Sequence, residues 1–366
     1  MSSTQLRRLD QRPIRLEGSA VPLIAPMKNE KTILPDFLRH YRGLGVSVFF
    51  IIDDNSDDGS LDYLLAQPDC HVFQSEGGFR QARYGADWMN EILNTHCTER
   101  WCLVVDCDEF LYYEDCERVP LPEFCERIGR QGADSVYASM IDMYPPGSFR
   151  KPAATSAASV VEQMPYFDSE YLFRPWPQRP WDPKPVPFFL QVIGGPRLRL
   201  QSSLDAESRR GAWHQTVCNQ VDRFVDRLPE SALPALAAIW PIELPAQQKR
   251  PLNYVRPGFT YHNPHGNSNS RLAGTITALA HYKFLGALDR RLERADILHQ
   301  HYRRGLSYLQ IERAIDRFGS ESLLYPGSVR LRSSADLSAV GLIGANIARL
   351  WRSATPIREI RTSLAA

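Results

Sequence analysis

The sequence predicts an α/β fold with a mainly parallel central sheet, followed by a proline-rich loop region and a helical C-terminal part. A hydrophobic content of 43% and a charged content of 23% are typical of a globular protein. The first 145 residues alternate between apolar runs of strand length and segments with helical periodicity. Such strand–helix alternation favours a parallel sheet with helices on both faces.

The elements of this first part follow in order along the chain. Apolar and β-branched runs predict strands at Val21–Pro26, Val46–Ile52, Cys70–Gln74, Trp101–Val105 and Ser135–Tyr144. Helical spacing of apolar residues predicts helices at Ile33–Leu44, Leu61–Gln67, Phe79–His96 and Leu121–Gln131.

The remainder of the chain has a different character. Residues 145–260 contain 17 of the 27 prolines, which predicts long ordered loops around a few strands such as Phe188–Ile193. From Ala273 to Phe318 the pattern predicts helices, and the tail from Ser328 is basic. We expect a main domain at 20–272 (its halves 20–145 and 146–272), C-terminal helices at 273–325, and an amphipathic or disordered tail at 326–366.

Charge and cysteine usage exclude several classes. The formal net charge of +1 provides no field for nucleic acid. No apolar run approaches the roughly 18 residues that span a bilayer, and the polar N-terminus lacks the apolar core of a signal peptide. The seven cysteines fit no zinc motif and are interpreted as free thiols, so we expect a cytoplasmic protein.

The strongest chemical signal is Asp106-Cys107-Asp108, which directly follows the apolar strand Trp101–Val105. In open α/β sheets, ligands bind beyond the carboxyl ends of the strands. Two aspartates there can hold a hard divalent cation that also binds a diphosphate. The alternative is a pair of solvated turn acids.

Two further segments follow predicted strands. Asp53 and Asp54 begin the turn Asp53–Gly59, where a carboxylate can accept a hydrogen bond from a ribose or a base, or instead cap the next helix. Glycines before Arg83 allow backbone N–H groups to approach phosphate, with Arg83 as a charged partner; an ordinary helix start is the alternative.

Together these segments resemble the family 2 glycosyltransferases, which have the nucleotide-sugar-binding fold called GT-A. Ala25–Glu30 resembles the family's Pro-x-x-Asn-Glu, Asp53–Gly59 its Asp-Asp-x-Ser-x-Asp-Gly turn, and Asp106–Asp108 its metal-binding pair. Gly194–Arg197 and His281–Phe284 are similar to the Gly-Gly-Pro-Arg and His-aromatic-Lys-Phe motifs of one bacterial branch. The likeness covers roughly residues 20–320 and departs from the family at Tyr84, where an Asn is usual.

The resemblance implies metal-dependent, inverting hexosyl transfer in polysaccharide biosynthesis, from a nucleoside-diphosphate sugar, most simply UDP-linked, to a glycan or lipid-linked acceptor. Asp106, Asp108 and His281 would hold Mn²⁺ or Mg²⁺. The nucleotide-sugar would be bound by Asn29, Glu30, Asp53, Asp54, Arg83, Asp106 and Lys283. Asp182, Asp205 and Glu207 are the candidates for the catalytic base. His262 and His265 compete with His281 as ligands, and a core histidine is the other interpretation of His281.

Two other functions stay open. The chain could be a glycosyltransferase-like protein that only binds a glycan, since no clear base motif is visible. It could also be a phosphatase of the haloacid dehalogenase type, although Phe110 stands where that motif requires Thr or Val. The apolar stretch Leu337–Leu350, with basic neighbours, could lie on the inner membrane surface or pack on the protein as a C-terminal helix.

Overall fold

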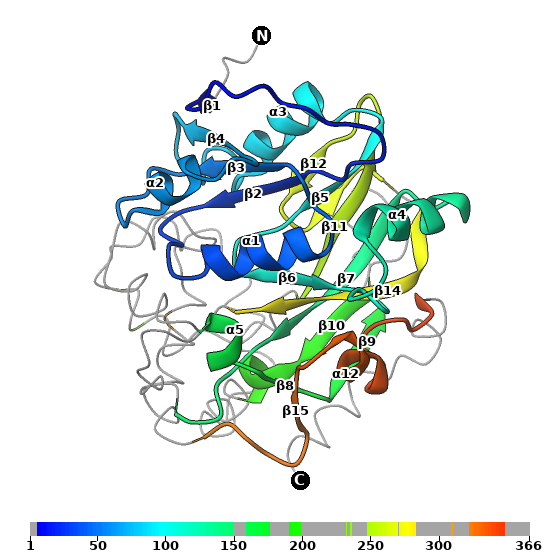
Figure 1. Ribbon diagram of the computed structural model, residues 1–366. Coiled ribbons are helices and arrows are strands. Elements are labelled where there is room, and N and C mark those ends of the chain that lie inside the picture. The colour runs from blue at the N-terminus through cyan, green and yellow to red at the C-terminus, as the bar shows by residue number, and fades with distance from the viewer. Residues whose placement is uncertain are drawn as a thin grey trace.

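The computed structural model describes residues 6–148, 159–175, 190–199, 247–269, 271–282 and 322–347, with the single residues 232, 235 and 309. Within these residues, nine strands form one mixed sheet in the order β1-β4-β3-β2-β5-β11-β7-β14-β6 (Figure 1). The expected α/β class is therefore confirmed.

Four adjacent parallel strands form the first half of the sheet. They are β4 (Cys70–Ser75), β3 (Phe49–Asp53), β2 (Leu23–Met27) and β5 (Arg100–Val104). Their side chains are almost all buried, as expected for strands covered on both faces. The short strand β1 (Leu6–Arg8) closes this edge antiparallel to β4.

The second half of the sheet is mixed. β11 (Gln248–Val255) runs antiparallel to both β5 and β7 (Ser135–Asp142). β14 (Leu272–His281) runs parallel to β7, and β6 (Glu109–Tyr112) pairs antiparallel with β14 at the far edge. It follows that β2, β3, β4, β5, β7 and β14 all point the same way, so their carboxyl ends share one edge.

The prediction of helix from Ala273 is wrong for Ala273–His281. These residues belong to β14, which is bonded to β7 on one side and to β6 on the other. The Ala, Leu and Gly residues of this segment do not favour a strand, but burial between two strands outweighs local propensity. The other residues of the predicted C-terminal helices, apart from the few described, lie outside the described part of the chain.

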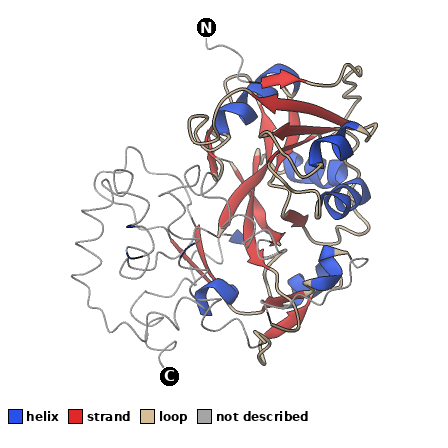
Figure 2. Ribbon diagram, turned by 90° about the vertical axis from the view of Figure 1, so that its left-hand side faces the viewer, coloured by secondary structure: helices blue, strands red, loops and turns tan. Residues whose placement is uncertain are grey.

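Helices cover both faces of the sheet (Figure 2). α1 (Leu34–Gly43), α2 (Ser60–Leu65) and α4 (Leu121–Arg130) contribute to one apolar cluster. α3 (Ala86–His96) contributes to the cluster on the other face. α3 begins seven residues later than expected because Arg83 and Tyr84 have left-handed backbone conformations, with φ of 50° and 59°.

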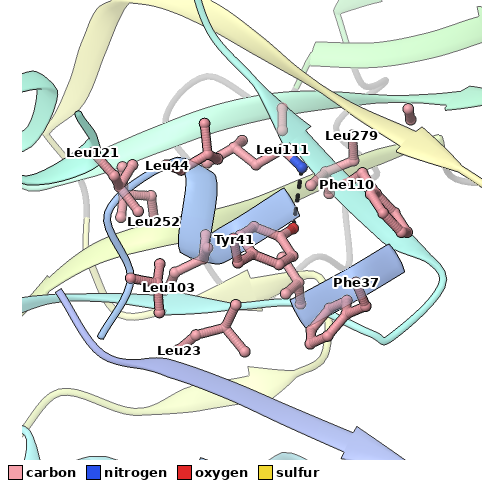
Figure 3. Packing of buried hydrophobic residues seen from close by; sticks show 14 of the residues in the cluster. Leu23, Phe37, Tyr41, Leu44, Leu103, Phe110, Leu111, Leu121, Leu252 and Leu279 are labelled. Atoms are coloured by element: carbon pink, nitrogen blue, oxygen red, sulfur yellow. Dashed lines mark hydrogen bonds between the residues drawn. The ribbon is translucent and has the colours of Figure 1, made fainter. Parts of the chain in front are cut away.

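The larger cluster also positions the segment after β5. Tyr41 of α1 donates from its hydroxyl to the Glu109 carbonyl at 2.7 Å and accepts from the Leu111 N–H at 3.0 Å. Figure 3 shows Tyr41 beside Phe110 and Leu111 within this cluster. A buried hydroxyl with both partners in β6 holds this strand against α1.

The remaining elements are short. They are α5 (Val160–Gln163), β8 (Tyr166–Asp168), β9 (Tyr171–Pro175), β10 (Leu190–Gly194), β12 (Tyr261–Asn263), β13 (Gly266–Asn267), β15 (Ser328–Arg330) and α12 (Ser334–Ala339). β10 pairs with β9, β12 with β13, and β15 with β8.

The described part of the tail packs on the protein. Leu337, Leu342 and Ile343 are at most 2% exposed and belong to the main apolar cluster. Ser334 donates to Glu117 from both its N–H and its hydroxyl, at 2.6 Å each. Leu337, Leu342 and Ile343 therefore pack on the protein, as the packed alternative expects, and residues 348–350 of this stretch lie outside the described residues. Among the described residues, no helix is long and apolar enough to cross a bilayer.

Candidate functional site

Six strand ends and the beginnings of β1, β6 and β11 meet at one edge of the sheet. β3, β5, β7 and β14 end there and deliver Asp53 and Asp54, Asp106 and Asp108, Asp142, and His281. The reversed strands β6 and β11 begin there, with Glu109 and with Lys249. This is the edge at which open α/β sheets bind ligands.

The two aspartates after β3 have different surroundings. Asp53 is fully buried, and its carboxylate caps the turn by accepting from the Ser56 N–H at 3.2 Å. Burial raises the pKa of Asp53. Asp54 accepts from the Ser75 hydroxyl at 2.7 Å through Oδ1, and Oδ2 receives no hydrogen bond from the described residues. Asp53 thus closes the turn at Ser56 and does not cap α2, whose N-cap is Gly59 without a side-chain hydrogen bond. Asp54 keeps an oxygen for a further donor.

Asn29 and Glu30 join the loop after β2 to the turn after β3. Asn29 has a left-handed backbone with φ of 59°, and its N–H donates to the Ser56 hydroxyl at 2.9 Å. Its side-chain oxygen accepts from the Asp57 N–H at 2.9 Å, while the Glu30 N–H donates to the Ser60 hydroxyl at 3.0 Å. In this structure Asn29 holds two loops together.

Asp106 lies against a buried lysine. Lys249 Nζ is 3.2 Å from Asp106 Oδ2 and 2.7 Å from Glu109 Oε2, and the lysine side chain is 2% exposed. Burial disfavours the charged lysine, but Asp106 and Glu109 outweigh this and raise its pKa. Glu109 also accepts from the Asp106 N–H at 2.9 Å, so this carboxylate fixes the backbone of the Asp106 turn.

Asp108 faces His281 instead. Its Oδ2 lies 3.4 Å from His281 Nε2, and the Tyr282 N–H donates to its carbonyl at 2.8 Å. His281 Nδ1 bonds Asp142 Oδ1 at 2.8 Å. His281 is therefore a buried histidine, but its ring bonds a carboxylate, in contrast to the core histidine with a backbone carbonyl partner that was the alternative.

Asp142 is the centre of a buried charge network. It is fully buried and forms an ion pair with the Nε of Arg197, a residue that is itself only 5% exposed. Burial would raise the pKa of Asp142, but Arg197 and His281 hold it at about 2. Burial lowers the pKa of His281, and the carboxylates of Asp108 and Asp142 outweigh this and raise it to about 9.

The residues present provide part of a cation site. Within the described ranges, no three His, Cys, Asp or Glu side chains converge in a geometry that would hold a metal ion. The 3.4 Å between His281 Nε2 and Asp108 Oδ2 is close to the spacing of about 3 Å between adjacent ligands of a six-coordinate ion. Hydrogen bonding of Nδ1 to a buried carboxylate is usual for a metal-binding histidine. These two donors fit Mn²⁺ or Mg²⁺ if a diphosphate completes the shell.

Arg83 is already engaged near the start of α3. Its Nε donates to Asp87 at 2.9 Å, and Nη1 lies 3.5 Å from the His262 carbonyl. Its side chain is 48% exposed, so the guanidinium still faces solvent. Of the competing histidines, His265 bonds the Gln248 carbonyl through Nδ1 at 2.8 Å, and His262 is exposed on β12.

Four predicted site residues fall outside the described residues. They are Asp182, Asp205, Glu207 and Lys283. Conversely, sequence reasoning missed Glu109, Asp142, Arg197 and Lys249 as members of this site. The only signal for Asp142 was an acid near the end of a predicted buried strand, and Lys249 had none, because its strand was not predicted.

In comparisons with known proteins, the sequence matches no protein-family model and no curated protein.

Proposed function

We propose that this protein is a metal-dependent glycosyltransferase of the GT-A type, which moves a sugar from a nucleoside-diphosphate sugar to a glycan or lipid-linked acceptor. One observation carries the proposal: the carboxyl ends of β3, β5, β7 and β14 bring Asp54, Asp108, Asp142 and His281 to a single edge of the sheet. Acids for a nucleoside and donors for a cation are what a nucleotide-sugar requires there.

Asp54 is the residue that we assign to the nucleoside. The Ser75 hydroxyl donates to one of its oxygens at 2.7 Å and so orients the carboxylate, while the described residues donate no hydrogen bond to the other oxygen. An ionised carboxylate can accept from a ribose hydroxyl or a base N–H, and hydrogen bonds to charged groups contribute about 1.5–3 kcal/mol. Asp53 would support this role indirectly, because it shapes the turn that carries Asp54.

Charge balance supports a divalent cation. Asp106, Asp108, Glu109 and Asp142 supply four negative charges, while Lys249 and Arg197 supply two positive ones in contact with them. An ion that replaces the proton on His281 Nε2 would face a cluster with a net charge of −2, which matches one divalent ion. When bound, Mn²⁺ or Mg²⁺ would neutralise the charge that develops on the departing nucleoside diphosphate. Asp108 and His281 would hold the ion, Asp106 would join them when the diphosphate is bound, and Asp142 would orient the His281 ring.

The catalytic base is proposed among Asp182, Asp205 and Glu207. Of the carboxylates at the edge, Asp142 and Glu109 are unsuited as the base, because both are fully buried and held in ion pairs. A base must reach the acceptor hydroxyl directly or through one water molecule. Six described cysteines are free and buried, which supports a reducing, cytoplasmic location for the reaction.

The test is thermal stabilisation by a panel of nucleotide-sugars, each measured with and without Mn²⁺. A ligand at about 100 times its dissociation constant adds roughly 2.7 kcal/mol to the free energy of unfolding. We expect one nucleoside class to raise the melting temperature, and Mn²⁺ to increase the effect. No stabilisation by any nucleotide-sugar would reject the proposal. Binding without sugar transfer in a turnover assay would favour the non-catalytic glycan binder, and an aspartyl-phosphate trapped at Asp106 would favour the phosphatase.

A further inference from the structure

Lys249 of β11 is a buried cation that contacts Asp106, the first aspartate of the Asp-x-Asp motif. β11 pairs antiparallel with β5, with Leu252 opposite Leu103. Towards the beginning of β11, after an irregularity in register, Lys249 pairs with Ala138 of β7. Backbone pairing therefore fixes the lysine in the sheet, and its side chain reaches Asp106 at 3.2 Å.

The contact with Asp106 goes beyond what burial of the lysine requires. A buried ammonium needs a counter-ion, and Glu109, which is only 1% exposed, supplies one at 2.7 Å. Asp106 is 47% exposed, yet its Oδ2 lies 3.2 Å from the same nitrogen. Lys249 thus holds a solvent-facing carboxylate that water could otherwise satisfy.

The two aspartates of the motif consequently have different cationic partners. Asp106 lies against Lys249, and Asp108 lies against His281. This division agrees with the finding that no three such side chains among the described residues are arranged to hold a metal ion. A divalent cation at Asp108 and His281 could use Asp106 only if that carboxylate rotated away from Lys249.

We propose that Lys249 competes with the divalent cation for Asp106, so that tight cation binding requires a nucleoside diphosphate. This inference rests on the proposed function. Without the diphosphate, Asp108 and His281 provide two ligands, which is too few for a stable Mg²⁺ or Mn²⁺ site. With it, phosphate oxygens complete the shell and offset the loss of the contact between Asp106 and Lys249. The cation and the diphosphate therefore bind cooperatively.

The experiment compares the wild-type protein with the double variant Glu109→Gln/Lys249→Met. This variant removes one negative and one positive charge, so the net charge of the site is unchanged. Gln preserves the shape of Glu109, and Met preserves most of the volume of the lysine stem. Replacing a buried ion pair by uncharged residues of similar size is often neutral for stability. The single variant Glu109→Gln keeps Lys249 and is the matched control.

Binding of free Mn²⁺ is measured by electron paramagnetic resonance, first alone and then with UDP, after circular dichroism has verified the fold. We expect UDP to tighten Mn²⁺ binding in the wild type. In the double variant, we expect Mn²⁺ alone to bind about tenfold more tightly than to the wild type, and UDP to tighten it less. In Glu109→Gln, Mn²⁺ alone should bind no more tightly than to the wild type.

The outcomes separate the two proposals. If the wild type binds neither Mn²⁺ nor UDP, the proposed function fails and this inference fails with it. If the wild type binds both, but the double variant shows the same affinity for free Mn²⁺ and the same effect of UDP, only the role of Lys249 is overturned. Equal tightening in Glu109→Gln would also overturn it, because Lys249 is still present there.

Discussion

Replacing Asp142 by Asn tests the buried network that supports His281. Asp142 is fully buried and forms an ion pair with Arg197. Its Oδ1 is hydrogen-bonded to His281 Nδ1 at 2.8 Å. Gln247 adds a third contact through its Nε2, 3.3 Å from Asp142 Oδ2. Asn preserves the size of the side chain but removes its charge, and one of its two polar groups becomes a donor that faces other donors.

The Asp142→Asn change is expected to lower both the free energy of unfolding and the affinity for the metal ion. Arg197 would remain buried without its counter-ion, and breaking a buried ion pair costs about 3–5 kcal/mol. A domain of this kind has about 5–15 kcal/mol of stability in total, so most of the protein should stay folded in the absence of denaturant. His281 would lose the acceptor that orients its ring, which typically weakens metal binding about 10–100-fold.

The assay pairs urea unfolding with Mn²⁺ binding in the presence of UDP. The matched control is Asp168→Asn, because Asp168 is also buried and bonded twice to an arginine, Arg199, at 2.9 Å. Asp168 bonds Tyr144 rather than His281. We expect both variants to lose stability and only Asp142→Asn to lose Mn²⁺ affinity. Equal Mn²⁺ affinity of the two variants, when folded, would refute the positioning role of Asp142.

Three further predictions concern single residues. Asp106→Ala and Asp108→Ala should each abolish sugar transfer with the fold preserved; near-normal turnover by either at saturating Mn²⁺ would contradict the metal assignment. Asp54→Ala should weaken UDP binding by about 1–3 kcal/mol in calorimetry, and an unchanged affinity would exclude Asp54 from the nucleoside site. Burial lowers the pKa of His40 from 6.5 to about 4, so the unfolded chain takes up this proton first and stability falls as the pH drops from about 6.5 to 4. His40→Gln should remove up to about 3 kcal/mol of this loss, and unfolding curves with the same pH dependence as the wild type would show that His40 is not responsible.

The parallel half of the sheet was predictable because its signals are local. β2, β3 and β5 are short apolar runs that are buried on both faces, and each ends at a polar turn. Asp54 and Asp108 could be proposed as site residues because they follow such strands directly. The sequence does not show how Asp54 differs from Asp53, or Asp108 from Asp106. These differences depend on the contact of Ser75 with Asp54 and of Lys249 with Asp106, and both partners are distant in sequence.

The second half of the sheet was not predictable in the same way. β14 lies between β7 and β6, and these pairings join residues more than 130 positions apart. The alanines and leucines of Leu272–His281 favour a helix and Thr275–Thr277 favour a strand, so only the long-range pairing decides that the whole segment is a strand. The start of α3 was predicted too early for a local reason. Arg83 and Tyr84 adopt positive φ, and this conformation cannot be predicted from Arg and Tyr as residue types.

Strand direction explains which site residues a search of the sequence can find. Strands that run towards the site edge contribute the residues at their ends, which is where ligand-binding acids are usually sought. β6 and β11 run the opposite way, so they contribute the residues at their beginnings, Glu109 and Lys249. A parallel strand in the place of β11 would have brought its carboxyl end to the acids of the motif. Its reversal instead brings a lysine to them, and the ion pairs of this lysine with Asp106 and Glu109 reduce the repulsion among three carboxylates within four residues. The reversed strand therefore supplies a positive charge within the acidic motif itself.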